Sequence, residues 1–257
     1  MIPLLLGLAF GQVPSTSSQM VVGVASGTES SKATLQRFER RDDAWVAVGS
    51  VVPARLGVNG LAWGSGFHPS VEGGMPKKEG DGRSPMGIFA FGQAFADQPP
   101  TPAHGWPMLQ TTLRDLWVED PASPTYNTHV RIPEGREMSE WEVGQRMRLG
   151  DAAHQLKVVV HHNTDPAVPG AGSAIFLHIW REQGERPTSG CTSLPEGELK
   201  GLLDWLDPAR EPVYVLLTEG LHAEHAEAWG LPALPGDGPG HTAPADPAAA
   251  DPERSLP

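Results

Sequence analysis

Cysteine is almost missing from this chain, because one residue of 257, Cys191, is a cysteine. A single thiol excludes an intramolecular disulfide, and it excludes a metal site built from several cysteines. Two interpretations remain for Cys191, an inert buried thiol or a nucleophile.

Basic residues are also scarce, with 19 Lys and Arg against 31 Asp and Glu, for a net charge of -12. Nucleic acids and anionic membranes are bound through basic surfaces. The composition therefore argues against both as partners. The acidity is equally consistent with a simple gain in solubility.

The apolar runs are too short to cross a bilayer as a helix. The first of them, at 2–10, opens a signal-like leader that we place at 1–18. It resembles the core of a secretion signal, although no basic residue precedes Lys32. We expect export to the periplasm or cell wall, and no integral membrane segment beyond this possible signal peptide.

Helical periodicity is rare, whereas 30 glycines and 26 prolines supply many turns. This pattern predicts a mainly β domain over 19–220, with long loops at 64–87 and 97–155, the second holding short helices. The Pro- and Ala-rich segment 221–257 predicts a disordered tail. The predicted strands are 19–24, 33–39, 45–48, 88–91, 156–162, 174–180 and 212–218.

One clear helix is predicted directly after the cysteine. Its apolar face is formed by leucines at helical spacing: Leu199, Leu202, Leu203 and Leu206. Ser193 and Glu196 match the capping box, with Ser193 as the N-cap. Cys191 would then lie two residues before the cap, where the helix dipole lowers the pKa of a thiol.

His178 lies on the predicted strand at 174–180, thirteen positions before Cys191. Strand alternation places Phe176, His178 and Trp180 on one face and Ile175, Leu177 and Ile179 on the other. The short loop at 181–187 allows the cysteine to return to the imidazole. A Cys–His pair is the minimum for acyl transfer through a thioester, although a structural histidine and an inert thiol are each more common.

Gly190 would let a substrate approach the backbone beside the thiol. The amides of Gly190 and Cys191 are candidates for binding a developing oxyanion.

Four segments occur in a recognisable order. They read Gly-Asp-Gly-Arg-Ser-Pro-Met-Gly-Ile-Phe at 80–89, Asp-Pro-Ala-Ser-Pro-Thr-Tyr-Asn at 120–127, Ser-Ala-Ile-Phe-Leu-His at 173–178 and Pro-Thr-Ser-Gly-Cys at 187–191. Together they resemble the L,D-transpeptidase catalytic domain family (YkuD-like), in particular an exported bacterial subgroup. The resemblance runs from about 19 to 217.

The resemblance implies a mixed β-sandwich with a few short helices. It assigns Cys191 as the nucleophile and His178 as the general base, and it places Thr188, Ser189 and Gly190 in the nucleophile motif. Ser189 stands where the common motif has a histidine, and Ser193 stands where many members have Arg or Asn.

Recognition of the donor peptide must therefore use other residues. Arg83 and His162 are the candidates for the substrate cleft, and Arg181 and Arg186 are further possibilities. His161 and His162 point to opposite faces of a strand, so they do not easily bind one metal ion. We expect no metal and no organic cofactor.

The implied partners are peptidoglycan stem peptides, and a monomer is expected. A Cys191 thioester would pass the acyl group to a second stem, giving 3–3 crosslinks, or exchange the terminal D-amino acid. Two alternatives stay open: an L,D-carboxypeptidase or endopeptidase in which water resolves the same thioester, and a non-catalytic wall-binding protein.

Overall fold

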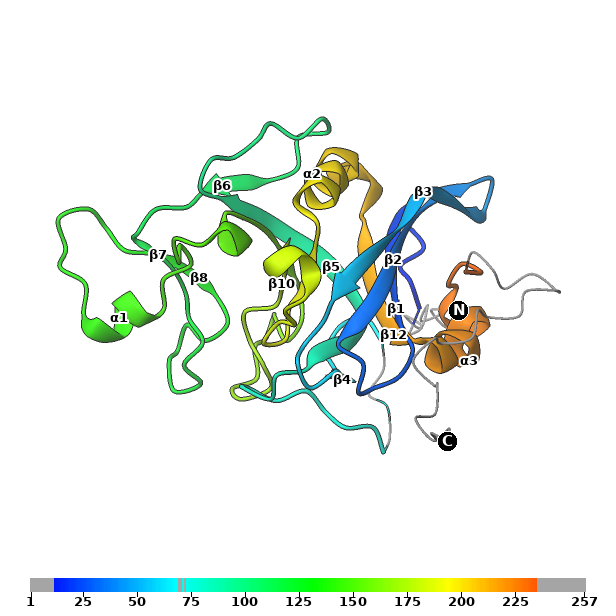
Figure 1. The fold of residues 1–257 in the computed structure, drawn as a ribbon, viewed down its shortest axis with the longest axis horizontal. Helices are drawn as coiled ribbons and strands as arrows, with labels where there is room; N and C mark the ends of the chain where they lie inside the picture. The colour runs from blue at the N-terminus through cyan, green and yellow to red at the C-terminus, as the bar shows by residue number, and fades with distance from the viewer. Residues whose placement is uncertain (1–11, 69–70, 72, 235–257) are drawn as a thin grey trace, which may run out of the picture.

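One strongly curved sheet organises the chain in this computed structural model, which describes residues 12–68, 71 and 73–234. The sheet has ten strands in the order β12-β1-β2-β3-β11-β10-β9-β5-β4, with β6 also paired to β5. Two further strands, β7 and β8, form a separate pair (Figure 1). The strands are β1 (Gln19–Ala25), β2 (Lys32–Arg41), β3 (Ala44–Arg55), β4 (Leu61–Trp63), β5 (Ser84–Ala96), β6 (Met108–Gln110), β7 (Asp115–Trp117), β8 (His129–Arg131), β9 (Leu156–Val160), β10 (Phe176–Ile179), β11 (Thr192–Leu194) and β12 (Val213–Thr218).

Strand β5 closes the sheet on itself. Its first half pairs with β12 and its second half with β9. The register shifts between Phe91 and Ala94, and an irregularity of this kind bends a strand and increases its twist. The result is the mainly β, barrel-like sandwich with a few short helices that the sequence predicts.

The predicted strands are all present, with shifted ends. β2 and β3 form a hairpin, in which Asp42 and Asp43 take φ values of 47° and 65°. Positive φ at both central residues is the geometry that matches the twist of paired strands. The predicted loop at 64–87 is too long, because β5 already begins at Ser84. Pro85 has no amide to donate, so the sequence there is typical of a loop.

Helix α2 (Glu196–Trp205) buries the predicted leucine face. The capping box predicted for it is wrong. Ser193 lies in β11, where it pairs with His178 and with Arg55, and the N-cap is Pro195 without a side-chain cap. Pairing with two strands outweighs the local capping preference. Cys191 is therefore not at the mouth of this helix.

The domain extends beyond both of its predicted limits. α3 (Glu219–Trp229) packs on β12 and β1, and Trp229 and Leu231 are buried in the core. Val13 is also buried, and its amide donates to the Trp229 carbonyl at 3.0 Å. Helix α3 lacks an apolar stripe, which explains why the sequence predicts that the tail begins at 221. Residues 1–11 and 235–257, which hold most of the predicted leader and tail, lie outside the described residues.

The remaining helices are short: α1 (Glu140–Gly144) and the 3-10 turns η1 (Ala152–His154), η2 (Glu182–Gly184) and η3 (Pro208–Arg210). A real capping box occurs at α1, between Ser139 and Glu142. No helix in the described part of the chain is long and apolar enough to cross a membrane.

Two apolar clusters occupy opposite faces of the β9–β10 region. Ile175, Leu177 and Ile179 belong to the larger one, whereas Phe176 belongs to the smaller, as the predicted alternation requires. The smaller cluster contains Phe95, Trp117, Met147, Val159 and Phe176, and Cys191 packs against it. The green excursion that carries β7, β8 and α1 covers this face (Figure 1).

Leu203 tests the contribution of α2 to the core. Its side chain is 1% exposed, so Leu203→Ala removes buried methyl groups and leaves a cavity. We expect a loss of about 2–5 kcal/mol in the free energy of unfolding, measured by urea titration. The exposed Glu198→Ala on the same helix is the control, and an equal loss in both variants would contradict this packing.

Candidate active site

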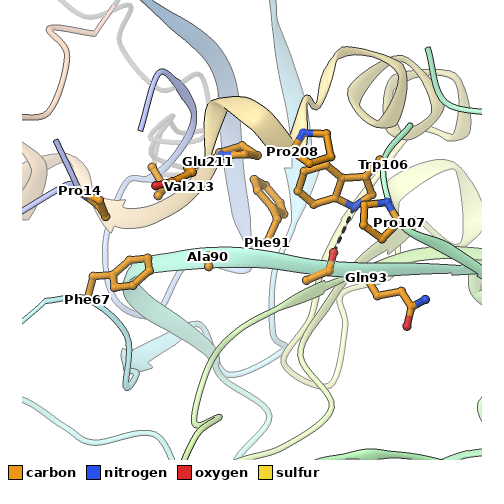
Figure 2. Close-up of a pocket in the computed structure, with 12 residues that line it drawn as sticks. Pro14, Phe67, Ala90, Phe91, Gln93, Trp106, Pro107, Pro208, Glu211 and Val213 are labelled. Atoms are coloured by element: carbon orange, nitrogen blue, oxygen red, sulfur yellow. Dashed lines mark hydrogen bonds between the residues drawn. The ribbon is translucent and has the colours of Figure 1, made fainter. Parts of the chain in front are cut away.

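Two cavities differ sharply in chemistry. The larger, of about 640 Å³, is lined by aromatic and proline residues such as Phe67, Phe91 and Trp106 (Figure 2). Trp106 donates its ring N–H to the Gly92 carbonyl at 3.1 Å, and Glu211 is the one ionisable residue of this lining. This cavity offers no nucleophile or base.

The second cavity, of about 320 Å³, holds Cys191, and we call it the Cys191 cleft. Its walls come from β9 and β10, from the segment before β11, and from the excursion between β6 and β9. Ser189 and Gly190 line it beside the cysteine. Cationic and acidic side chains also line it: Lys77, Glu79, Glu119, Arg146, His154, Lys157 and Arg181.

Strand register brings the candidate residues to one face. His178 on β10 lies opposite Ser193 on β11 and opposite Lys157 on β9. Cys191 is two residues before Ser193, so its side chain falls on the same face of the sheet. Cys191, directly before β11, is thus expected to be a diagonal neighbour of His178 on β10, although His178 is 4% exposed and is not among the residues that line the cleft. The thiol itself donates to the Ala174 carbonyl at 3.4 Å in this structure.

His178 is held in one orientation. Its Nδ1 lies 2.7 Å from the Ile179 carbonyl, which can only accept a hydrogen bond. The proton is therefore assigned to Nδ1, which leaves the Nε2 lone pair free to act as a base. Burial lowers the pKa of His178 to about 4, so the imidazole is neutral at neutral pH.

A second imidazole, His154, stacks on His178 with ring centroids 5.2 Å apart. Its Nδ1 lies 2.7 Å from Asp151, which also accepts a hydrogen bond from Arg181 at 2.6 Å. Burial opposes ionisation of Asp151, but these two partners outweigh it and lower its pKa to about 2. Arg181 is thus near the cleft, as expected, but its charge is already paired.

The expectation of a preformed thiolate is wrong. Helix α2 begins at Glu196, five residues after the cysteine, so its dipole does not act on the sulfur. Loss of water around the sulfur raises the pKa of Cys191 to about 11, although the residue remains half-buried at the cleft. Cys191 is therefore a neutral thiol that needs a base.

Thr188 and Gly190 shape the loop that carries the thiol. Thr188 Oγ1 donates to the Cys191 carbonyl at 2.6 Å and accepts from the Gly190 amide at 3.1 Å. Gly190 has φ 145°, and a Cβ there would lie 3.0 Å from the Arg83 carbonyl. The close approach of the Arg83 carbonyl therefore favours glycine at position 190. The Gly190 amide already donates to Thr188, so it is not free to bind an oxyanion in this structure.

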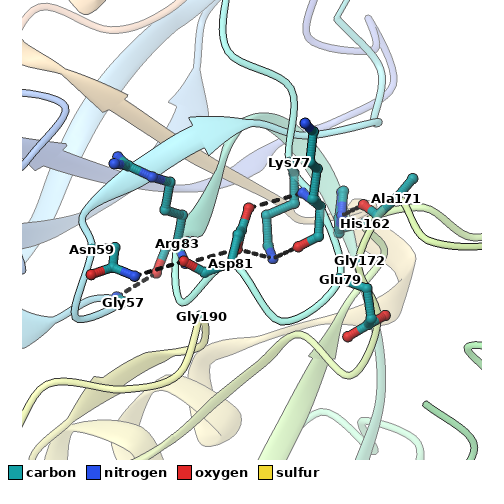
Figure 3. Close-up of polar contacts among 12 residues, drawn as sticks. Gly57, Asn59, Lys77, Glu79, Asp81, Arg83, His162, Ala171, Gly172 and Gly190 are labelled. Atoms are coloured by element: carbon teal, nitrogen blue, oxygen red, sulfur yellow. Dashed lines mark hydrogen bonds and ion pairs between the residues drawn. The ribbon is translucent and has the colours of Figure 1, made fainter. Parts of the chain in front are cut away.

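Arg83 and His162 do not lie as expected. The Arg83 guanidinium binds Glu29 at 3.0 and 3.1 Å and points away from the Gly190 segment, although its backbone lies against it (Figure 3). His162 is 1% exposed and uses both ring nitrogens, toward the Ser65 amide and the Ala171 carbonyl. Neither side chain lines the Cys191 cleft.

The segment at 77–83 is fixed by a buried ion pair. Lys77 Nζ contacts Asp81 at 2.6 Å, and Asp81 also accepts hydrogen bonds from the backbone amides of Lys78 and Arg83 (Figure 3). This pair holds Lys77 and Glu79 in the wall of the cleft. Arg186, the remaining arginine candidate, is exposed and faces Glu182 at 3.7 Å.

The last two residues of the segment at 120–127 do not line the cleft but contact residues that do. Tyr126 donates its hydroxyl to Glu79. Asn127, with φ 57°, accepts from the ring N–H of Trp117 and from the Ala174 amide, and donates to the carbonyls of His162 and Asn163. The Asn127 amide group thus ties together three segments around the cleft.

Sequence reasoning missed Lys157 and His154. Lys157 had a readable signal, because it is a single cation inside the apolar strand Leu156–Val160. His154 had none, since it lies in an irregular segment.

Asn127→Ala tests this amide. The substitution leaves buried donors and acceptors unpaired, at about 1–3 kcal/mol each. We expect a markedly lower melting temperature, measured by circular dichroism, and slower alkylation of Cys191 in the folded protein if the cleft collapses. The neighbouring exposed Thr128→Ala is the control, and an unchanged melting temperature for Asn127→Ala would contradict the role given to this residue.

The chain is similar to a known family of proteins. Residues 24–215 match the model of the L,D-transpeptidase catalytic domain, YkuD. Curated proteins give no match. A solved structure described as Bdellovibrio bacteriovorus Bd1075 aligns at 14% identity and a TM-score of 0.39, covering 85% of this chain and 56% of that protein. The family match spans most of the chain, and the protein therefore belongs to the L,D-transpeptidase catalytic domain family.

Proposed function

We propose that this protein is a cysteine-dependent L,D-transpeptidase that acts on peptidoglycan stem peptides in the periplasm or cell wall. The observation that supports the proposal is the register of β10 with β11, from which Cys191, which lines the cleft, and the buried His178 are expected on one face of the sheet. The family match supports the substrate class.

The proposed first step is acyl transfer to the sulfur. His178 Nε2 takes the thiol proton as Cys191 attacks the carbonyl at the L-centre of the third residue of a donor stem. The bond to the terminal D-amino acid breaks, and His178 returns the proton to the leaving amine. The products are a Cys191 thioester and a free D-amino acid.

The second step releases the acyl group. A side-chain amine of another stem attacks the thioester, its proton passes to His178 and then to the thiolate, and a 3–3 crosslink forms. A free D-amino acid as acceptor would give exchange of the terminal residue. The Cys191 amide is the candidate donor to the oxyanion, because the Gly190 amide is bound by Thr188.

The nucleophile is tested by a covalent adduct. A carbapenem is expected to add its full mass to the purified protein at Cys191, detected by intact-mass spectrometry and peptide mapping. Cys191→Ala should lose the adduct and all turnover while keeping its melting temperature. An adduct that persists in Cys191→Ala would contradict the assignment of Cys191 as the nucleophile.

Muropeptide products then separate transfer from hydrolysis. Tetrapeptide monomers should be converted to 3–3 dimers, measured by chromatography and mass spectrometry. Shortened monomers without dimers would support the carboxypeptidase alternative, and no turnover with any stem would support a non-catalytic role.

The pH dependence of acylation tests the neutral Cys–His pair. A base with a pKa of about 4 remains unprotonated above that pH, so acylation should be constant through neutral pH and fall about tenfold per unit only below about pH 4. Rates of carbapenem adduct formation between about pH 3.5 and 8 measure this, with folding checked at each pH. An acid limb near the ordinary histidine value of 6.5 would refute it.

A further inference from the structure

We propose that Lys157 and Arg146 form a carboxylate-binding subsite beside Cys191, and that the acyl donor must present a carboxylate close to the bond that breaks. The inference rests on the proposed acyl transfer. The sequence offered Arg83 and His162 as candidates for recognition of the donor peptide. This inference assigns that role to Lys157 and Arg146.

Lys157 is a buried amine that forms no ion pair within the described part of the chain. Burial lowers its pKa to about 8, and the charges of Asp97, Asp151 and Glu119 act in the opposite direction. Lys157 is 2% exposed, and its Nζ donates to the Met147 carbonyl at 2.5 Å and lies 5.5 Å from the centre of the Phe176 ring. No carboxylate of the described residues forms an ion pair with it. An ammonium has three protons to donate, and burying such a charge unpaired is costly.

Arg146 is the second cation with unused donors. It lines the Cys191 cleft, its buried Nε has no hydrogen-bond partner, and its Nη2 contacts only the Met138 sulfur, at 3.8 Å. Among the described residues no carboxylate pairs with it. A guanidinium is a planar fork that fits a carboxylate with two parallel hydrogen bonds.

The other cations of the cleft are already neutralised. Lys77 is paired with Asp81 and Arg181 with Asp151, both at 2.6 Å. The positive charge that remains for a ligand is therefore that of Lys157 and Arg146.

Both cations line the same cleft as the thiol. The carbonyl that accepts from Lys157 belongs to Met147, the residue after Arg146. Lys157 is also the cross-strand partner of His178, and its ammonium lies over Phe176, which shares the smaller apolar cluster with Cys191. An anion between Lys157 and Arg146 would thus sit within the same cleft as the reacting sulfur.

The acidic side chains of the cleft do not fill this place. Glu79 accepts a hydrogen bond from Tyr126. Burial and the nearby charge of Glu79 raise the pKa of Glu119, whereas the charge of Lys157 lowers it. Among the described residues, neither Glu79 nor Glu119 forms an ion pair with Lys157 or Arg146.

A stem peptide offers two carboxylates near the scissile bond. One is the terminal carboxylate of the leaving D-amino acid, and the other is the side-chain carboxylate of the diamino acid. Both present the same chemistry to Lys157 and Arg146, and amidation removes either one selectively.

The experiment compares three tetrapeptide donors: the free acid, the C-terminal carboxamide and the side-chain carboxamide. In the parent protein we expect kcat/KM to fall about 10- to 100-fold for one of the two amides, the loss typical of a charged hydrogen bond. The affected amide identifies the carboxylate. Equal kcat/KM for all three donors would overturn the proposal without any variant.

The variants then assign the effect to the two residues. In Lys157→Met the acid-to-amide ratio should fall toward one, in Arg146→Gln it should fall in part, and Lys157→Arg should retain most of it. Lys200→Met, on the exposed face of α2, is the matched control. An unchanged ratio in a folded Lys157→Met would show that Lys157 acts only on the thiol or on stability, because either effect lowers all donors equally.

A smaller probe separates this inference from the proposed function. Where the C-terminal carboxamide is the poor donor, N-acetyl-D-alanine should protect Cys191 from alkylation by iodoacetamide at least about tenfold better than its carboxamide does, and the difference should vanish in Lys157→Met. Such protection without turnover of any stem would refute the proposed transferase and keep the subsite. Turnover of stem peptides with equal kcat/KM for the free acid and the carboxamides would support the proposed transferase and refute the subsite.

Discussion

The pairing of β10 with β9 on one side and β11 on the other is the constraint on which the site depends. Because strand side chains alternate, this register assigns Lys157, His178 and the side chain of Cys191 to one face. A shift of one residue in either pair would turn its chemical groups into the larger apolar cluster. The sheet's closure through β5 in turn holds β9 in place.

Burial sets the chemistry of that face. It lowers the pKa of His178 and raises that of Cys191, so both groups rest in their neutral forms. A neutral pair avoids the cost of two charges in a poorly hydrated place. In the proposed mechanism, the thiol becomes reactive only when the imidazole takes its proton, which would couple reactivity to the arrangement of a bound substrate. The same lack of water lowers the pKa of Lys157 to about 8, and an anion bound beside its ammonium would favour the charged form.

Much of the fold was readable from the sequence, and the site only in part. Alternation at 174–180 gave the correct face for His178 because it is a property of any strand. The capping box at Ser193 failed because pairing with His178 and Arg55 overrode a local signal. The prediction that Arg83 lines the cleft was wrong because its guanidinium binds Glu29, which is far from it in the sequence. Contacts between residues far apart in sequence, such as His154 with His178, leave no local pattern to read.

The bond between the Val13 amide and the Trp229 carbonyl has a mechanical consequence. It joins two residues that lie near the two ends of the described part of the chain. A pull on either end would load the β1–β12 pair, whose strands run parallel, before it reached β9 or β10. A circular permutant could therefore be made by linking the chain near Trp229 to the chain near Val13 and opening it in an exposed loop, with the barrel left intact.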